Sequence, residues 1–210
     1  MTMLSINTNV GALKAATASY SVNKSMETSM NRLSTGKRIN SAADDAAGLQ
    51  ISQRLTAEIR GIDQAIRNAA DGQSMLATAE GATIEIHAIL QRMRELAVQS
   101  ANGTMATADR TAINSEFVAL EAEVNRINDN TTWNGILLTQ GSFITTVGGV
   151  FHVGPDASQT ITHQIENLAT TAIGLVDAIT LATLAGANAA ITAIDQAISV
   201  VGTEREQMGA

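Results

Sequence analysis

The sequence predicts a mainly α-helical protein, an elongated bundle of long coiled-coil-like helices with a small β-hairpin region. Aromatic residues make up only 2% of the 210 residues, although apolar residues reach 45%, and Pro155 is the single proline. Thin aliphatic side chains suit the narrow seams between long helices better than a compact aromatic core. Over three long segments, apolar residues recur at alternating steps of three and four, which is the helical spacing.

The first long helix is expected to follow Ser41, which begins a capping pattern with Asp44. Asp44 and Asp45 would lie in its first turn, where the helix dipole favours acids. No proline interrupts the segment before about Ser100, and Asn102-Gly103 then provides a stop signal. Its apolar positions are Leu55, Ile59, Ile62, Ile66, Ile86, Leu90, Met93 and Ala97.

Two further helices are expected later in the chain. Thr107 would cap one that reaches about Asp129, and the other would run from about Gln164 to the end of the sequence. Each has a single apolar stripe, so the helices must pack on one another or on neighbouring subunits. The stripes are Ile113, Phe117, Leu120, Val124 and Ile127 in one, and Ile191, Ile194, Ile198 and Val201 in the other.

Between these two helices, glycine, threonine and β-branched residues become frequent. Two short alternating runs flank Gly154-Pro155-Asp156, which predicts a β-hairpin within about 136–165. Pairing about Asp156 would place His152 opposite Thr160. At the other end, residues 1–40 are expected to form a marginal helix that orders only against a partner. The predicted domains are therefore 1–40 and a helical domain over 41–210.

Charge and cysteine content exclude several classes of protein. The chain has no cysteine, which removes disulfides and thiolate sites. A net charge of −7 makes nucleic acid a poor partner. The charge is uneven: residues 1–38 carry five bases and one acid, whereas from residue 127 onward Arg205 is the only base against seven acids. The ends of the chain therefore differ in sign, which would favour contact between them.

No enzyme, metal, cofactor or membrane signal emerges from the residues. His87, His152 and His163 lie in different contexts without ligand spacing, and no phosphate-binding or dinucleotide fingerprint is present. No apolar leader opens the chain. The uncharged stretch 178–194 is too short and too polar to span a bilayer. We therefore expect no catalysis, no cofactor and no membrane insertion.

Five stretches, in order, resemble conserved segments of bacterial flagellin, and together they cover nearly the whole chain. They are Ser5–Asn9, Leu33–Leu49 (LSTGKRINSAADDAAGL), Gln91–Gln99 (QRMRELAVQ), Trp133–Leu138 (WNGILL) and Ile194–Ala210. The resemblance implies a structural subunit of the flagellar filament that self-assembles with identical subunits for motility. Residues 1–40 would then be its inner-tube segment.

The resemblance also implies where such a protein acts and what it meets. Flagellins are extracellular proteins of the bacterial flagellum, exported without a cleaved signal peptide. Their partners would include a flagellar export chaperone, the type III export apparatus and a Toll-like innate receptor.

One candidate contact surface follows from the Gln91–Gln99 motif. Arg92, Leu96 and Gln99 would form a second stripe beside the core stripe of the helix, an apolar residue flanked by polar ones. The alternative is a solvated face with one exposed leucine. By resemblance, Arg92, Leu96 and Glu116 would contact neighbouring subunits and the innate receptor.

The chain departs from the family in two ways. It lacks variable outer domains, and it stops before the C-terminal inner-tube helix that pairs with the N-terminal one. We therefore expect a truncated form that stays monomeric or weakly associated by itself; long filaments formed by this chain alone in electron micrographs would contradict this.

Other readings remain open at this point. A hook–filament junction protein belongs to the same axial family. A cell-surface ligand-binding protein on a flagellin fold would use the hairpin or a helix groove, and a ligand-binding assay would reveal it. A signalling coiled coil fits the apolar spacing but not the hairpin.

Overall fold

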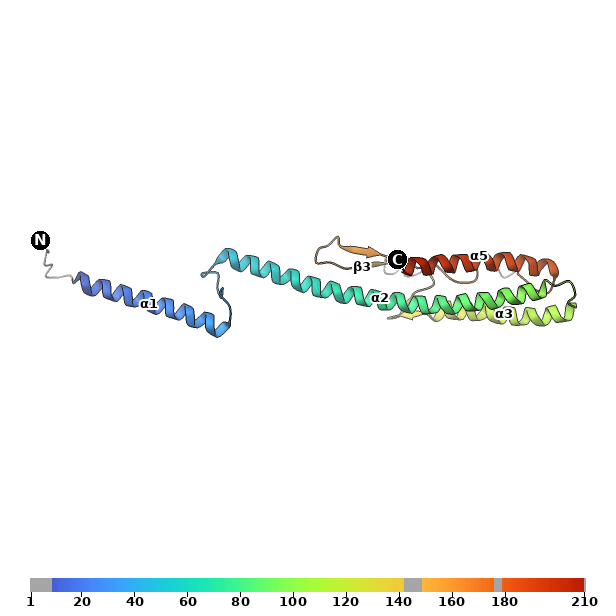
Figure 1. Ribbon diagram of the computed structural model, residues 1–210, viewed down its shortest axis with the longest axis horizontal. Coiled ribbons are helices and arrows are strands. Elements are labelled where there is room, and N and C mark those ends of the chain that lie inside the picture. The colour runs from blue at the N-terminus through green and yellow to red at the C-terminus, as the bar shows by residue number, and fades with distance from the viewer. Residues whose placement is uncertain (1–8, 142–148, 176–178, 210) are drawn as a thin grey trace. The chain divides into compact units, whose positions relative to one another are not determined.

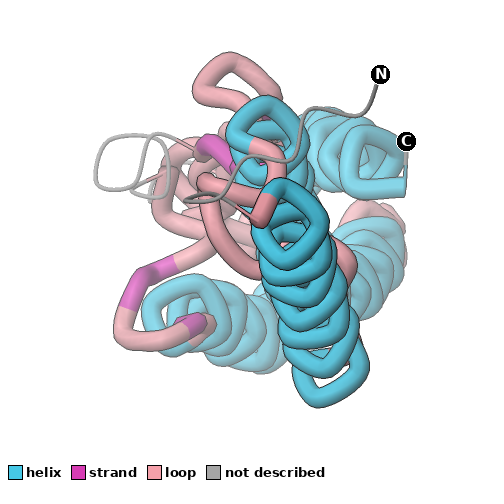
Figure 2. Tube along the Cα trace, turned by 90° about the vertical axis from the view of Figure 1, so that its left-hand side faces the viewer, coloured by secondary structure: helices cyan, strands magenta, loops and turns pink. Residues whose placement is uncertain are grey.

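The computed structural model describes residues 9–141, 149–175 and 179–209. They form four long helices and four short strands, so the predicted mainly α-helical class is confirmed (Figures 1 and 2). The chain divides into two compact units, residues 1–60 and 61–210. The division falls inside helix α2 (Ala46–Ser100), so each unit is described by itself.

The first unit contains helix α1 (Val10–Thr35). Asn9 caps it, because its side-chain Oδ1 accepts a hydrogen bond from the Ala12 N–H at 3.1 Å. Gly36 ends it in the left-handed conformation that favours glycine. None of the 26 residues of α1 is buried. Its large apolar side chains are 56–81% exposed in the described chain.

Helix α2 begins slightly later than the sequence predicts. Asp44 lies outside the helix, where its Oδ2 accepts hydrogen bonds from the N–H groups of Asn40 and Ser41. These bonds hold the pKa of Asp44 below its ordinary value. Asp45 caps the helix instead, with its Oδ1 accepting from the Gly48 N–H at 2.8 Å. The expectation that both acids lie in the first turn is therefore wrong.

Three helices share the core of the second unit (Figure 1). They are the C-terminal part of α2, α3 (Thr107–Asn130) and α5 (Leu184–Gly209). Ala106 precedes α3 without a side-chain cap, so the predicted cap at Thr107 is wrong. Among the described residues, this core contains one buried aromatic ring, Phe117. The buried apolar residues that the three helices contribute to it are Ile86, Leu90, Met93, Leu96, Ala97, Ile113, Phe117, Val124, Ala187, Ala190, Ile194, Ala197 and Val201.

The segment before α5, described over residues 164–175 and 179–183, is irregular, which overturns the predicted helix from about residue 164. Its apolar side chains are buried in the core, and polar side chains of α3 satisfy its backbone. Asn114 Oδ1 accepts from the Leu181 N–H at 2.7 Å, and Asn125 Oδ1 accepts from the Thr170 N–H at 3.1 Å. Such hydrogen bonds replace those that a helix would make, so the segment is ordered without being helical.

Two antiparallel hairpins lie beside the helices. Strands β1 (Thr132–Trp133) and β2 (Ile136–Leu137) pair across Asn134-Gly135, whose positive φ angles of 48° and 78° are those of a tight hairpin turn. Strands β3 (Val150–His152) and β4 (Thr160–Thr162) pair with His152 opposite Thr160, as the sequence predicts. Only this second hairpin was predicted from the sequence.

The β3–β4 hairpin rests on α2 because two glycines make room for it. A Cβ atom on Gly72 would lie 3.0 Å from Cδ1 of Phe151, and one on Gly61 would lie 3.0 Å from Cβ of Pro155. Between them, the Asn68 side chain donates a hydrogen bond to the backbone carbonyl of His152 at 2.9 Å. Close approach of the hairpin therefore depends on the absence of side chains at these helical positions.

The pair Gly72→Ala and Gly81→Ala tests this dependence. Alanine in place of a helical glycine stabilises by about 0.5–1 kcal/mol where space allows. Gly81 has nothing within 4 Å of an added Cβ, so we expect that gain there. At Gly72 the Phe151 ring must move, so we expect a smaller gain or a loss, with faster amide hydrogen exchange in β3 and β4. Equal effects of the two changes on unfolding and exchange would contradict the proposed docking.

Candidate functional site

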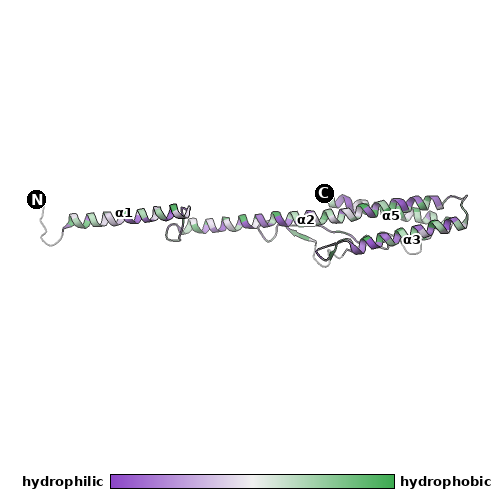
Figure 3. Ribbon diagram, turned by 90° about the horizontal axis from the view of Figure 1, so that it is seen from below, coloured by the Kyte–Doolittle hydropathy of each residue, from purple (hydrophilic) through white to green (hydrophobic). Residues whose placement is uncertain are grey.

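One candidate surface is an apolar stripe on the part of α2 that belongs to the first unit, where the 4-3-4 spacing had predicted Leu55 and Ile59 as apolar positions of a helix. It consists of Ile51, Leu55 and Ile59, which are 48–59% exposed. These residues lie within about 80° of one another around the helix, at about 100° per residue. The alternation of apolar and polar residues along the helix is visible in Figure 3. We call this set the α2 stripe.

Helix α1 carries a comparable set of exposed apolar side chains. Tyr20 is 74% exposed and Leu33 is 81% exposed. Single exposed apolar residues are common, whereas sets of this size mark surfaces that other molecules cover. The other members are Val10, Leu13, Val22, Met26 and Met30.

Arg92 on α2 forms an ion pair with Glu116 on α3, so the structure brings these two predicted contact residues together. The Nη2 and Nε atoms of Arg92 donate to Glu116 Oε1 at 2.8 and 3.1 Å, and Nη1 donates to Glu95 Oε2 at 3.0 Å. The pKa of Arg92 is raised, chiefly by the hydrogen bond to Glu116. About half of each side chain of the Arg92–Glu116 pair remains exposed. Both groups are therefore accessible to a partner.

Leu96, the third predicted contact residue, is 1% exposed and packs in the helical core. The prediction that it is the apolar centre of an exposed stripe is wrong. Since both α3 and α5 pack on α2, the buried side of α2 is wider than one stripe and includes Leu96 with Met93 and Ala97. Gln99, the other end of the predicted stripe, is exposed.

A buried carboxyl on α5 was missed by the sequence analysis. Glu204 is 3% exposed, and its Oε2 accepts a hydrogen bond from the Glu166 N–H at 3.3 Å. Burial raises its pKa above the ordinary value, and the nearby Glu166 carboxylate adds to the effect. His163, which lies three residues before Glu166 in the chain, is also affected: burial lowers its pKa. The position of Glu204 three residues after Val201 is the one signal that could have indicated it.

We expect Glu204→Gln to stabilise the protein at neutral pH. Because the folded pKa of Glu204 lies above its ordinary 4.5, the contribution of this group to stability is greatest below that pH and is lost as pH rises through the folded pKa. Glutamine keeps the acceptor for the Glu166 N–H and has no charge. The advantage should therefore be present at pH 7 and shrink below about pH 4.5, as measured by urea unfolding.

The exposed Glu206 on the same helix provides the control, since Glu206→Gln should have little effect. The His163 contribution has the opposite sign, being lost as pH falls, and it cancels when variant and wild type are compared at one pH. A destabilised Glu204→Gln at pH 7 would contradict the prediction.

Within the described residues, no three His, Asp or Glu side chains converge as metal ligands would. His152 is tied to the hairpin through Nδ1 and the Gln159 carbonyl, 3.1 Å apart. His87 contacts Gln91 one turn along α2.

Among the described residues, α5 is long and apolar enough to cross a membrane by length and composition alone. Its position in the structure gives this apolarity another explanation. Ala187, Ala190 and Ile194 on α5 lie fully buried in the core of the second unit, and Asp195 pairs with Arg94 of α2 at 2.6 Å. We therefore interpret α5 as a core helix.

The fold and its surfaces define a class: a helical-bundle protein with small hairpins and exposed apolar faces of the kind that other chains cover. The family model for the N-terminal helical region of bacterial flagellin matches residues 6–143. The chain belongs to the bacterial flagellin family.

Several relatives support this membership. B-type flagellin of Pseudomonas aeruginosa is 45% identical over 171 residues, which is 81% of this chain and 34% of that protein. Flagellin A of Vibrio cholerae is 56% identical over 140 residues, which is 67% of this chain and 37% of that protein. The chain thus spans about a third of the length of these curated relatives.

Solved structures agree with the fold. Bacillus cereus flagellin superposes with a TM-score of 0.59 at 31% identity, covering 68% of this chain and 81% of that one. FliC from Burkholderia pseudomallei has a TM-score of 0.53 at 18% identity, over 66% of this chain and 97% of that one, which supports the fold alone.

Proposed function

We propose that the chain is a structural subunit of the bacterial flagellar filament, which acts outside the cell and assembles with identical subunits through helix packing. The observation that carries the proposal is the apolar surface left exposed on α1 and along the α2 stripe. A side chain of this kind gains about 1.5–3 kcal/mol when it is fully buried. Family membership indicates which assembly would bury it.

The proposal also assigns a place in the filament to each predicted domain and a route of export to the chain. Residues 1–40 are its inner-tube segment, and 41–210 form the outer helical domain that carries the hairpin. Before assembly the chain engages an export chaperone and the type III export apparatus, and it reaches the flagellum without a cleaved signal peptide. The absence of buried residues in α1 supports this, because a helix whose apolar side chains stay exposed gains stability from a partner both in transit and in the filament.

Co-assembly tests the function directly. The labelled chain would be mixed with full-length flagellin and sonicated filament seeds, and the filaments collected by centrifugation. The labelled chain should pellet with the filaments in proportion to the amount added. Its absence from the pellet, while the full-length flagellin polymerises, would overturn the proposal.

We also propose that Arg92 and Glu116 contact neighbouring subunits and a Toll-like innate receptor, with Leu96 supporting them from the core. The half-exposed ion pair offers charged groups of both signs on a surface that two helices hold in place. Leu96 contributes by packing in the core rather than by touching a partner. Its substitution would disturb the fold as well as the contact surface, so the two effects could not be told apart.

Arg92→Ala is therefore the informative change. We expect little change in the unfolding midpoint, because exposed ion pairs contribute little to stability. Binding to the immobilised receptor ectodomain and co-pelleting with filaments should both fall. Arg126→Ala, which removes the exposed Arg126–Glu123 pair within α3, is the control. Receptor affinity unchanged by Arg92→Ala would remove the receptor from the proposal.

A further inference from the structure

Charge is distributed very unequally between the two units. Residues 1–60 carry seven Lys or Arg and four Asp or Glu, a formal charge of +3. Residues 61–210 carry six Lys or Arg and sixteen Asp or Glu, a formal charge of −10. All three lysines of the chain, Lys14, Lys24 and Lys37, lie in the first unit. Two copies of the chain therefore attract when the first unit of one faces the second unit of the other.

The basic residues of the second unit are mostly engaged within it. Arg92, Arg94 and Arg126 form ion pairs with acids. Arg110 Nε donates to the Ser100 carbonyl at the end of α2. Many of the sixteen acids are thus left without a neutralising base on their own unit.

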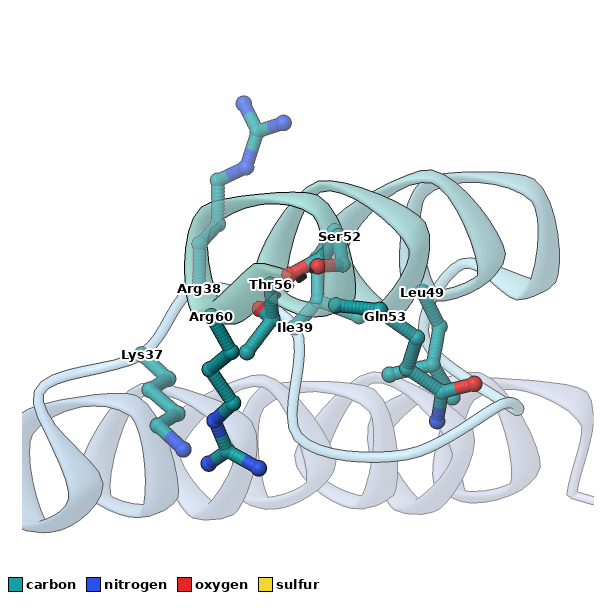
Figure 4. A pocket seen from close by; sticks show the side chains of 9 residues that line it. Lys37, Arg38, Ile39, Leu49, Ser52, Gln53, Thr56 and Arg60 are labelled. Carbon is teal, nitrogen blue, oxygen red and sulfur yellow. Dashed lines mark hydrogen bonds between the residues drawn. The ribbon is translucent and has the colours of Figure 1, made fainter. Parts of the chain in front are cut away.

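The first unit, in contrast, has an open groove with cations and no acid in its lining. The groove has a volume of about 690 Å³ and lies between the α1–α2 connection and the first turns of α2. Figure 4 shows the side chains of Lys37 and Arg60 reaching the same side of the groove from these two elements, whereas Arg38 points away. The rest of the lining consists of Ile39, Leu49, Ser52, Gln53, Thr56 and Ala57.

Neither Lys37 nor Arg60 forms an ion pair with an acid among the described residues, in contrast to Arg92, Arg94 and Arg126. Two like charges held on one side of a groove repel each other, and a carboxylate between them would remove the repulsion. The hydroxyls of Ser52 and Thr56 and the amide of Gln53 add groups that can hydrogen-bond to it. The groove therefore fits a carboxylate-bearing surface.

We infer that the groove containing Lys37 and Arg60 is the docking site for the acidic second unit of another copy of this chain. The inference deepens the proposed function, on which it rests, by naming one subunit contact. A second copy is favoured because it supplies the complementary charge of −10. A nucleic acid would meet that same charge as repulsion.

Carbodiimide cross-linking tests the contact, since the reagent joins a lysine amine to a carboxylate that touches it. Equal amounts of unlabelled and ¹⁵N-labelled full chain would be cross-linked, and mass spectrometry would identify peptides that join the two isotopes. We expect links from Lys37 of one copy to acids within 61–210 of the other, in excess over links from Lys14 and Lys24. The links should diminish as salt rises from about 10 mM to about 1 M, where the Debye length falls from about 30 to about 3 Å.

Matched substitutions on α2 complete the test. Arg60→Gln should lower the yield of Lys37 links about two- to fivefold, which corresponds to one exposed charge contact. Arg54→Gln, on the same helix outside the groove lining, should not. Lys37 links no more frequent than those of the other lysines, or equal effects of the two substitutions, would overturn the inference. Protection of Lys37 by inorganic phosphate without inter-copy links would also overturn it.

The two proposals fail separately. A chain that pellets with filaments but gives no Lys37 links retains the filament function and loses this contact. A chain that gives Lys37 links but never enters filaments retains the contact and loses the function.

Discussion

Phe117→Ala is expected to lower the free energy of unfolding of the second unit by about 3–5 kcal/mol, the usual cost of truncating a buried phenylalanine. Phe117 is 1% exposed and lies in the core shared by α2, α3 and α5. The surrounding side chains come from three long helices that cannot move independently to fill the space. Most of the cavity should therefore remain, and urea unfolding followed by circular dichroism would measure the loss.

Val118→Ala is the matched control, because Val118 is the next residue of α3 and is 50% exposed. It should cost well under 1 kcal/mol, as surface substitutions usually do. Similar losses at the two positions would show that Phe117 is not the centre of the core. In that case the three-helix packing described for the second unit would be wrong.

The helices could be predicted from sequence because their signals are local. The end of α2 near Ser100 and the extent of α3 follow from apolar spacing and turn residues within a few positions. The irregular segment that precedes α5 could not be predicted in this way. Asn114 and Asn125 hold it from 45 or more residues away in sequence. The spacing of apolar residues is the same whether the backbone makes helical hydrogen bonds or hydrogen bonds to distant side chains. It therefore does not distinguish a helix from such an irregular segment.

Contacts with elements distant in sequence also explain why the predicted contact residue Leu96 is buried. The spacing of Arg92 and Leu96 gives their separation around one helix, but not which neighbours cover that helix. With α3 and α5 both packed on α2, Leu96 is buried and Arg92 is left at the edge beside Glu116. The first hairpin, in contrast, had a local signal in Asn134-Gly135, which sequence analysis could have used.

The second large effect is expected in assembly rather than in folding. The double change Leu55→Gln and Ile59→Gln replaces two neighbouring members of the α2 stripe, which are 48% and 59% exposed. Each buries apolar surface when α2 meets another subunit, at about 1.5–3 kcal/mol for a full side chain. With both sites only partly buried on assembly, a total near 3 kcal/mol corresponds to an association constant on the order of 100-fold lower. Co-pelleting with filaments should fall accordingly.

Measurements of folding distinguish a loss of subunit contact from a variant that fails to assemble because it is misfolded. The two side chains contribute little to the stability of the monomer, because about half of each is exposed. The circular dichroism spectrum and the unfolding midpoint of the double variant should therefore match the wild type. Gln50→Ala changes an exposed residue on the opposite side of the same part of α2, at about 100° per residue, and should leave co-pelleting intact. A double variant that pellets normally would mean that the α2 stripe stays exposed in the filament. The exposed apolar surface would then need an occupant other than an identical subunit, and it would no longer support a role in the filament.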